Sequence, residues 1–184
     1  MMPKPGEFAV ASLDAGAAAA RLPAWMPLYN ACFNPPPWNE PTRGAVEYTA
    51  QTAWHLEQPG FTALEARTPS GLPAGVAYGW PTPVPWPDTE FYRAIVRDLP
   101  PHHAGQLAAR GTFEVVELMV DPAMRGRGLA RMLLDTLIAN YRRAWLCTLP
   151  ESPAAAMYRR WGWREMGVFD TDRHPRLEAY LLIG

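Results

Sequence analysis

The chain has 184 residues, which fits one domain with a sizeable core, and 48% of them are hydrophobic while only 19% are charged. This composition excludes a chain that is disordered throughout. Because 17 basic and 18 acidic side chains give a formal charge of -1, with no dense basic block, we expect no nucleic-acid partner.

The two cysteines, Cys32 and Cys147, have neither Cys-x-x-Cys spacing nor a histidine pair nearby, so no zinc site or disulfide framework is indicated. The paired His102 and His103 have no third ligand at metal spacing, and we expect no metal. The sequence shows no secretion signal and no apolar run near the ~18 residues that span a bilayer. We therefore expect a soluble, cytoplasmic protein without a membrane partner.

The first half of the chain predicts strands and helices separated by proline-rich loops. We expect a strand at 7–13, helical material at 17–33 that Pro23 and Pro27 interrupt, a stiff loop at 34–41, a helix at 42–58 capped by Thr42, and a hairpin of strands at 61–67 and 74–80.

The segment 81–111 is rich in proline and contains a predicted helix at 88–97. Its length indicates an insertion rather than a simple turn. Because no repeat of fixed period and no flexible linker divides the chain, we interpret residues 1–184 as a single domain.

Strands and helices alternate clearly in the second half. We expect a strand at 112–120, a turn at 121–126, a helix at 127–142, a strand at 144–149, a helix at 153–161, and strands at 163–169 and 177–183. The first of these helices has an apolar stripe formed by Ala130, Leu133, Leu134, Leu137 and Ile138. The second has Ser152 as its cap, Pro153 in its first turn and Gly162 just past its end.

The turn before the 127–142 helix has the features of an anion site. Gly126 and Gly128 let the backbone approach a ligand, and the helix that begins here offers N–H groups and a positive dipole end. Arg125, Arg127 and Arg131 add positive charge that suits a diphosphate. The alternative is that these arginines are only solvated residues on a surface turn.

The order Glu117-Leu-Met-Val-Asp121-Pro-x-x-Arg125-x-x-Gly128-x-Ala130 resembles the GNAT superfamily of acetyl-CoA-dependent N-acetyltransferases. The signature of that family is Arg or Gln, two residues, Gly, one residue, then Gly or Ala. The segment 158–163 also looks like the Tyr-x-x-x-Gly-aromatic segment of the family. The resemblance is strong over 112–166 and weak over 1–111, and at Glu151 the chain lacks an asparagine that often touches the cofactor.

This resemblance implies an α/β (α+β) fold with a mixed, mostly antiparallel central sheet of about seven strands, flanked by helices and splayed between the fourth and fifth strands. It also implies acetyl-CoA as the acyl donor. The cofactor-binding residues that it implies are Leu118, Met119, Val120, Arg125, Gly126, Arg127, Gly128, Leu129, Ala130 and Arg131. The oligomeric state stays open, with a homodimer as one option.

A dinucleotide-binding turn of the Gly-x-Gly-x-x-Gly type is a competing interpretation, because Gly126 and Gly128 also follow a strand and open a helix. Its third glycine would fall at Arg131. That mismatch and the missing acidic ribose ligand argue against it.

Acyl transfer to an amine needs a base for the ammonium, whose pKa is near ~10.4, and a proton donor for the leaving thiolate. Glu114 and Glu117 are the candidate bases; alternation places them on opposite strand faces, and we favour Glu117, nearer the turn. Either could instead be a solvated or salt-bridged surface residue. By resemblance, Tyr158 would donate to the thiolate, although a helical tyrosine is otherwise more often a core residue. Cys147 lies mid-strand, so we expect it to be inert.

Aromatic side chains gather in or beside the two proline-rich loops, namely Phe33, Trp38, Trp80, Trp86 and Tyr92. They could wall a site for a small organic amine, or they could cap the core beneath the loops. Three functions follow: acetyl transfer to a small-molecule amine, the same reaction on a protein or peptide amine, and acyl-CoA binding without catalysis.

Overall fold

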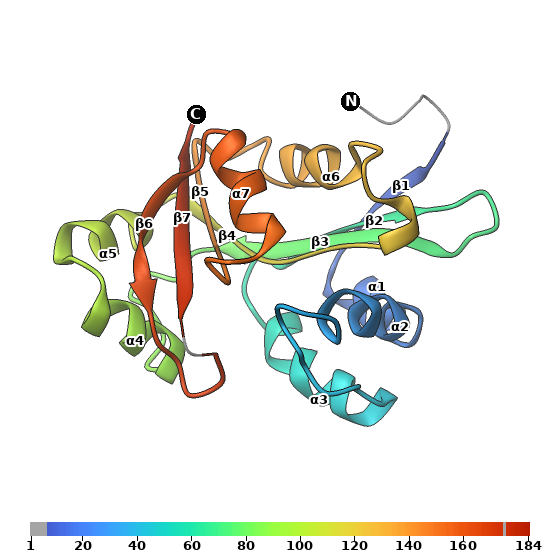
Figure 1. Ribbon diagram of the computed structural model, residues 1–184, viewed down its shortest axis with the longest axis horizontal. Coiled ribbons are helices and arrows are strands. Elements are labelled where there is room, and N and C mark those ends of the chain that lie inside the picture. Colours follow the sequence, from blue (N-terminus) through green and yellow to red (C-terminus); the bar gives the residue numbers. More distant parts are fainter. Residues whose placement is uncertain (1–6, 175) are drawn as a thin grey trace. The chain divides into compact units, whose positions relative to one another are not determined.

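The computed structural model describes residues 7–174 and 176–184. The chain forms two compact units, each of which is described by itself. The first unit comprises Met1–Trp80 and Val115–Ala139, and the second comprises Pro81–Glu114 and Asn140–Gly184. The seven strands have the order β1-β2-β3-β4-β5-β7-β6 in one sheet, and β4 (Thr112–Val120) contributes its first residues to the second unit and the rest to the first (Figure 1).

In the first unit, β1 (Ala9–Leu13) and β3 (Pro73–Pro81) pair antiparallel with β2 (Thr62–Arg67) on either side. The hairpin between β2 and β3 therefore lies where the sequence predicts it. The helices of this unit are α1 (Ala15–Ala19), α2 (Leu22–Phe33), α3 (Ala45–Leu56) and α6 (Leu129–Leu137). In Figure 1, α6 lies on one face of these strands while α1 and α2 lie on the other.

The N-terminal helices differ from the prediction in two ways. Asp14 caps α1 by accepting a hydrogen bond from the Ala17 N–H at 2.8 Å, and α2 then continues through Pro27 without interruption. The helix α3 begins after Gly44, so Thr42 is not its cap; the Thr42 hydroxyl instead accepts a hydrogen bond from the Asn34 amide at 2.8 Å. The expectation for Thr42 was wrong because tertiary contacts drew its hydroxyl into the preceding loop.

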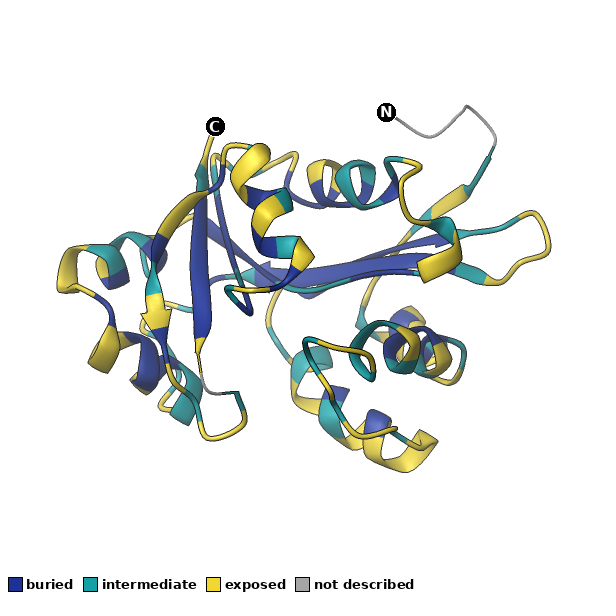
Figure 2. Cartoon of the chain, viewed as in Figure 1, coloured by how far each residue is buried: buried dark blue, intermediate teal, exposed yellow. Residues whose placement is uncertain are grey.

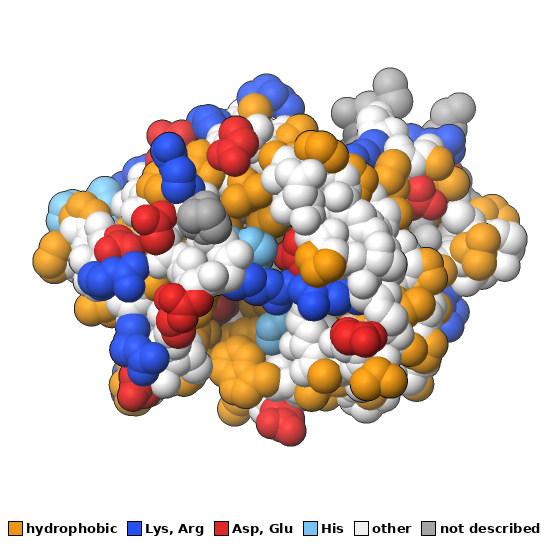
Figure 3. Space-filling view, turned by 60° about the horizontal axis from the view of Figure 1, so that its bottom comes forward, with side chains coloured by type: hydrophobic (Ala, Val, Ile, Leu, Met, Phe, Trp, Pro, Cys, Tyr) orange, Lys and Arg blue, Asp and Glu red, His pale blue; other side chains and the backbone are white. Residues whose placement is uncertain are grey.

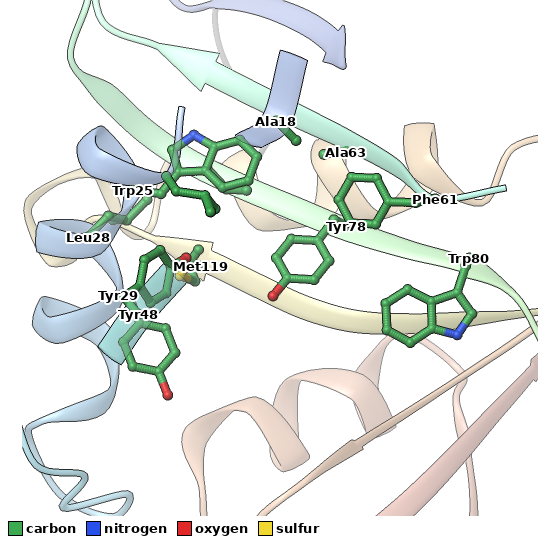
Figure 4. Packing of buried hydrophobic residues seen from close by; sticks show 12 residues of the cluster. Ala18, Trp25, Leu28, Tyr29, Tyr48, Phe61, Ala63, Tyr78, Trp80 and Met119 are labelled. Carbon is green, nitrogen blue, oxygen red and sulfur yellow. The ribbon is translucent and has the colours of Figure 1, made fainter. Parts of the chain in front are cut away.

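An aromatic core fills the space between the strands and the helices α1, α2 and α3. Figure 2 shows the strands of the sheet as largely buried, and Figure 4 shows the aromatic rings of this core at close range. The buried residues of this cluster are Ala18, Leu22, Trp25, Leu28, Tyr29, Tyr48, Phe61, Ala63, Val76, Tyr78, Trp80 and Met119. Because three different helices and three strands contribute to it, this cluster fixes the helices on that face of the sheet.

A fully buried carboxylate ties α2 to the sheet. Glu65 in β2 accepts hydrogen bonds from the Arg21 guanidinium at 2.9 Å and from the Trp25 indole N–H at 2.9 Å. A buried charge is tolerated only when it is paired and hydrogen-bonded in this way.

In the second unit, the first three residues of β4 pair in parallel with β5 (Arg143–Thr148), from Thr112↔Arg143 to Glu114↔Trp145. The strand β7 (Leu177–Ile183) pairs antiparallel with both β5 and β6 (Arg164–Phe169). The helices are α4 (Glu90–Asp98), α5 (Pro101–Leu107) and α7 (Pro153–Arg160). Ser152 caps α7 as predicted, since its hydroxyl accepts a hydrogen bond from the Ala155 N–H at 3.1 Å.

The mixed, mostly antiparallel seven-stranded sheet with helices on it confirms the predicted fold class. Two features were missed. The helix α5 was not expected, and α6 is shorter than the predicted 127–142 helix, with Leu129 rather than Ala130 at the start of its buried stripe. The splay between β4 and β5 stays a prediction. In the described part of the chain, no helix is both long and apolar enough to cross a bilayer.

Candidate active site

The turn that follows β4 has the backbone conformation that an anion site requires. After Val120, a 3-10 turn at Pro122–Met124 is capped by Asp121, whose carboxylate accepts a hydrogen bond from the Ala123 N–H at 2.9 Å. Gly126 and Gly128 then adopt φ of 76° and 80°, in the left-handed region that favours glycine. The sequence therefore placed the two glycines correctly.

The helix α6 begins at this turn without a side-chain cap. Gly128 is the N-cap, and because it has no side chain, no side-chain oxygen bonds the first N–H groups of the helix. Such N–H groups and the helix dipole attract anions, and a diphosphate is the group that they would suit. A Cβ added at Gly126 would meet no atom within 4 Å, so the turn has open space beside it.

The helix α6 is held against β3 by a close contact at Gly75. A Cβ at this position would lie 3.0 Å from the Leu133 side chain and 3.0 Å from the Met119 carbonyl oxygen. Only glycine permits this approach, and it fixes where the N-terminus of α6 stands relative to the end of β4.

The three arginines of the turn have partners within the protein. Arg127 pairs with Glu7 at 2.9 Å and Arg131 with Asp135 at 2.5 Å, while the Arg125 Nε donates to the Val120 carbonyl oxygen at 3.3 Å. Exposed ion pairs contribute only about 0–1 kcal/mol, so a phosphate could displace their carboxylates. Figure 3 shows the same mixture on the face that it presents, where basic side chains lie among acidic and hydrophobic ones.

The predicted cofactor strand, residues Leu118, Met119 and Val120, ends next to this turn. Met119 is fully buried in the aromatic core, whereas Leu118 is half-buried. The Val120 carbonyl accepts a hydrogen bond from the Cys32 thiol at 3.4 Å as well as the one from Arg125. Burial raises the pKa of the Cys32 thiol, which favours the neutral form of this side chain.

Glu117 lies close to three tyrosines of the aromatic core. Burial and, after it, the Glu117 carboxylate raise the pKa of Tyr29 to about 12, and the same two causes, in the same order, raise the pKa values of Tyr48 and Tyr78. The three phenols are therefore protonated at neutral pH, and the carboxylate that we favoured as the base faces an aromatic, hydroxyl-lined region.

Two of these phenols are engaged by neighbours. The Tyr29 hydroxyl donates to Glu40 at 2.8 Å and accepts from the Gln51 amide at 2.9 Å. The Tyr78 hydroxyl is 3.1 Å from Nδ1 of His55. No pattern in the sequence indicated this cluster, because residues 29, 48 and 78 belong to two helices and a strand far apart in the chain.

Glu114 has a different environment in the second unit. It is buried and accepts a hydrogen bond from the Tyr92 hydroxyl at 2.9 Å. Its charge also contributes, after burial, to raising the pKa of Cys147, in keeping with an inert thiol. The two glutamates of β4 thus differ in surroundings: Glu114 is hydrogen-bonded within a core, and Glu117 faces the tyrosine cluster.

Tyr158 is buried in the second unit, in α7. Its ring lies 5.8 Å from that of Trp163 and 5.9 Å from that of Tyr180, measured between ring centroids. This packing holds the phenol in one orientation. Its predicted role as a proton donor stays a prediction.

The five aromatic residues that were expected to form one wall fall into two groups. Phe33, Trp38 and Trp80 belong to the first unit, with Phe33 and Trp38 packed edge to face at 5.3 Å. Trp86 and Tyr92 belong to the second unit and stack on each other at 5.3 Å. Trp80 and Tyr92 are nearly fully buried, so at these two positions the rings form part of the core.

Among residues 7–174 and 176–184, no three His, Cys, Asp or Glu side chains are grouped so that they could hold a metal ion. His103 instead places Nδ1 2.5 Å from the Met166 carbonyl oxygen, and His55 contacts Tyr78.

Comparisons with known proteins agree with the motif at the end of β4. Residues 90–165 match the model of the acetyltransferase (GNAT) domain, so the match starts within the segment 81–111 that was interpreted as an insertion. A search of curated proteins finds no match.

Solved structures share this fold over nearly the whole chain. An acetyltransferase from Thermus thermophilus is 15% identical, covers 96% of this chain and 97% of its own, and has a TM-score of 0.65. The candidate acetyltransferase yncA from Salmonella typhimurium, solved with acetyl-CoA, is 17% identical over 97% of this chain and 94% of its own, with a TM-score of 0.59. The spermidine N-acetyltransferase SpeG from Vibrio cholerae is 15% identical over 96% and 94%, with a TM-score of 0.57. At these identities the similarity shows the fold.

Proposed function

We propose that this chain, which carries a GNAT acetyltransferase domain, transfers the acetyl group of acetyl-CoA to a primary amine of a small molecule. One observation carries the proposal. A glutamate facing a tyrosine cluster and a glycine turn that opens a helix belong to the same compact unit, only a few residues apart along β4 and the turn that follows it.

The turn suits the acyl donor. Gly126 and Gly128 leave the backbone exposed at the N-terminus of α6, where the first N–H groups would hold the diphosphate of the carrier. Arg125, Arg127 and Arg131 would add positive charge there. Acetyl-CoA supplies an acetyl thioester, which a neutral amine can attack without a covalent enzyme intermediate.

Glu117 is the residue that we assign as the base. A protonated alkylamine has a pKa near ~10.4, so a carboxylate must accept its proton, directly or through water, before the amine can attack. The contacts of the two candidates favour Glu117, because Glu114 is buried and bonded to Tyr92. We assign Tyr158 to the leaving thiolate, since a phenol with a pKa near ~10 stays protonated at neutral pH.

Two other functions use parts of the same site. A protein or peptide amine could replace the small molecule if the acceptor side were an open groove. An acyl-CoA-binding domain without catalysis would keep the turn but not need Glu117. The fold is shared with a spermidine N-acetyltransferase, which supports small polyamines as acceptors to test.

The test measures release of the CoA thiol from acetyl-CoA with a panel of small amines and lysine peptides, alongside calorimetric binding of acetyl-CoA. We expect turnover with small amines. Glu117→Gln should lower kcat by about 10²- to 10⁴-fold, the usual contribution of a general base, and leave acetyl-CoA binding unchanged. Glu57→Gln, an exposed glutamate after α3, is the matched control and should have no effect.

Tight binding of acetyl-CoA without thiol release for any amine would support the non-catalytic alternative. Turnover with peptides alone would support the protein acceptor. Equal rates for Glu117→Gln and the wild-type enzyme would remove Glu117 from the reaction.

A further inference from the structure

The hydroxyl of Tyr48 is a buried polar group without a visible purpose in the fold. Tyr48 lies in α3 and is 1% exposed, and within the described residues its hydroxyl oxygen has no hydrogen-bond partner. Burying a hydroxyl without a partner is unfavourable, and native proteins retain few such groups. A ligand that bonds to this oxygen would explain why it is kept.

The tyrosines around it show which group has spare capacity. The rings of Tyr29 and Tyr48 lie 5.1 Å apart between centroids, and Figure 4 shows them side by side. The Tyr29 hydroxyl is bonded to Glu40 and Gln51, and that of Tyr78 to His55. Figure 4 also shows the Tyr48 hydroxyl pointing away from the Tyr29 ring, so it is available to a third group.

The charge at this place is negative. Glu117 is close enough to Tyr29, Tyr48 and Tyr78 for its charge to act on all three phenols. The other carboxylate at the cluster, Glu40, is paired with Arg43 at 3.3 Å. A carboxylate beside aromatic ring faces attracts a cation, both by charge and by the ring quadrupole.

We propose that the acceptor amine enters as an ammonium group bound between the Glu117 carboxylate and the Tyr48 hydroxyl, beside the rings of Tyr29 and Tyr48. The site would therefore select primary amines that carry no carboxylate next to the amino group. The ammonium donates one hydrogen bond to Glu117 and one to Tyr48, and it loses a proton to Glu117 before attack. This inference rests on the proposed acetyl transfer and narrows its substrate class.

The selectivity follows from charge. A carboxylate on the carbon that bears the amino group would stand within a few ångströms of Glu117, and two like charges at that distance repel strongly where water is excluded. Such a carboxylate would also compete for the hydrogen bond that the Tyr48 hydroxyl can offer.

The first test compares two matched pairs of amines, 2-phenylethylamine with phenylalanine and 1,4-diaminobutane with ornithine. We expect kcat/KM to be at least about tenfold higher for the amine without the carboxylate in each pair, since each 1.4 kcal/mol corresponds to a factor of ten. Equal or higher values for both amino acids would overturn the proposal.

The second test uses Tyr48→Phe. We expect the KM for the preferred amine to rise about tenfold or more, because a hydrogen bond to a charged group is lost, while the KM for acetyl-CoA stays the same. The thermal midpoint of the ligand-free protein should stay the same or rise, since the variant removes an unbonded hydroxyl; a purely structural tyrosine would show the opposite. Tyr141→Phe, a tyrosine outside this cluster, is the control and should leave all three values unchanged.

Calorimetric titration with the same amines separates this inference from the proposed function. Binding that Tyr48→Phe weakens, without any thiol release, would overturn acetyl transfer but support the ammonium site. No binding and no turnover with any amine would overturn the site. An amine KM unchanged by Tyr48→Phe would also overturn it, as would a crystal structure in which a water remains on the Tyr48 hydroxyl when the amine is bound.

Discussion

Replacing Gly126 by alanine tests whether the turn after β4 needs its left-handed backbone. Gly126 has φ of 76°, and an added Cβ would meet no atom within 4 Å, so strain in the backbone is the whole effect. A left-handed conformation costs an L-residue roughly 1–2 kcal/mol. For a chain of this length, each kcal/mol lowers Tm by about 2–4 °C, so we expect Gly126→Ala to lower Tm by roughly 2–8 °C.

Gly105→Ala is the control with the opposite sign. Gly105 lies inside α5, has a helical backbone, and also has open space where a Cβ would stand. Alanine in a helix interior is more stable than glycine by roughly 0.5–1 kcal/mol, so Tm should rise by roughly 1–4 °C. Thermal unfolding followed by circular dichroism measures both variants.

Titration with acetyl-CoA completes the test. Gly126→Ala should weaken binding because the turn relaxes from the conformation that exposes its N–H groups, and Gly105→Ala should not change it. If Gly126→Ala lost stability but bound acetyl-CoA as well as the wild-type protein, the turn would not be the diphosphate site. If it lost neither, the argument from φ would be refuted.

Two further predictions concern the second unit. Tyr158→Phe should lower kcat while acetyl-CoA affinity stays within about twofold, because only the departing thiolate would sense the hydroxyl; equal rates in both proteins would exclude Tyr158 from the reaction. Hydrogen bonds from the Arg97 side chain, then that from the Asp170 N–H, lower the pKa of Asp98 to about 2 from 3.8. Since the folded-state pKa lies below the unfolded one, this stabilisation is present above about pH 4 and lost as pH falls toward 2. Asp98→Asn should therefore lower Tm at neutral pH, and its difference from wild type should shrink between pH 4 and 2; a difference that stays constant over that range would contradict this assignment.

The sequence determined the parts of the protein that depend on neighbouring residues. The strand at 112–120, the two glycines of the turn after it and the Ser152 cap of α7 all lie where they were predicted. Each depends on side-chain alternation, on a φ that only glycine adopts readily, or on a hydroxyl three residues from its N–H partner. These constraints act over one or two turns of chain, so they can be read directly from residue order.

The tertiary structure decided which distant residues surround Glu117 and Glu114. Tyr29, Tyr48 and Tyr78 meet at Glu117, and Tyr92 bonds Glu114, yet no spacing in the sequence indicates these partners. Such contacts depend on strand register and on how helices pack on the sheet, and both are set by burial of apolar surface throughout the core rather than by any local pattern. For the same reason the prolines and Thr42 misled the prediction of the N-terminal helices, since packing there outweighed local propensity.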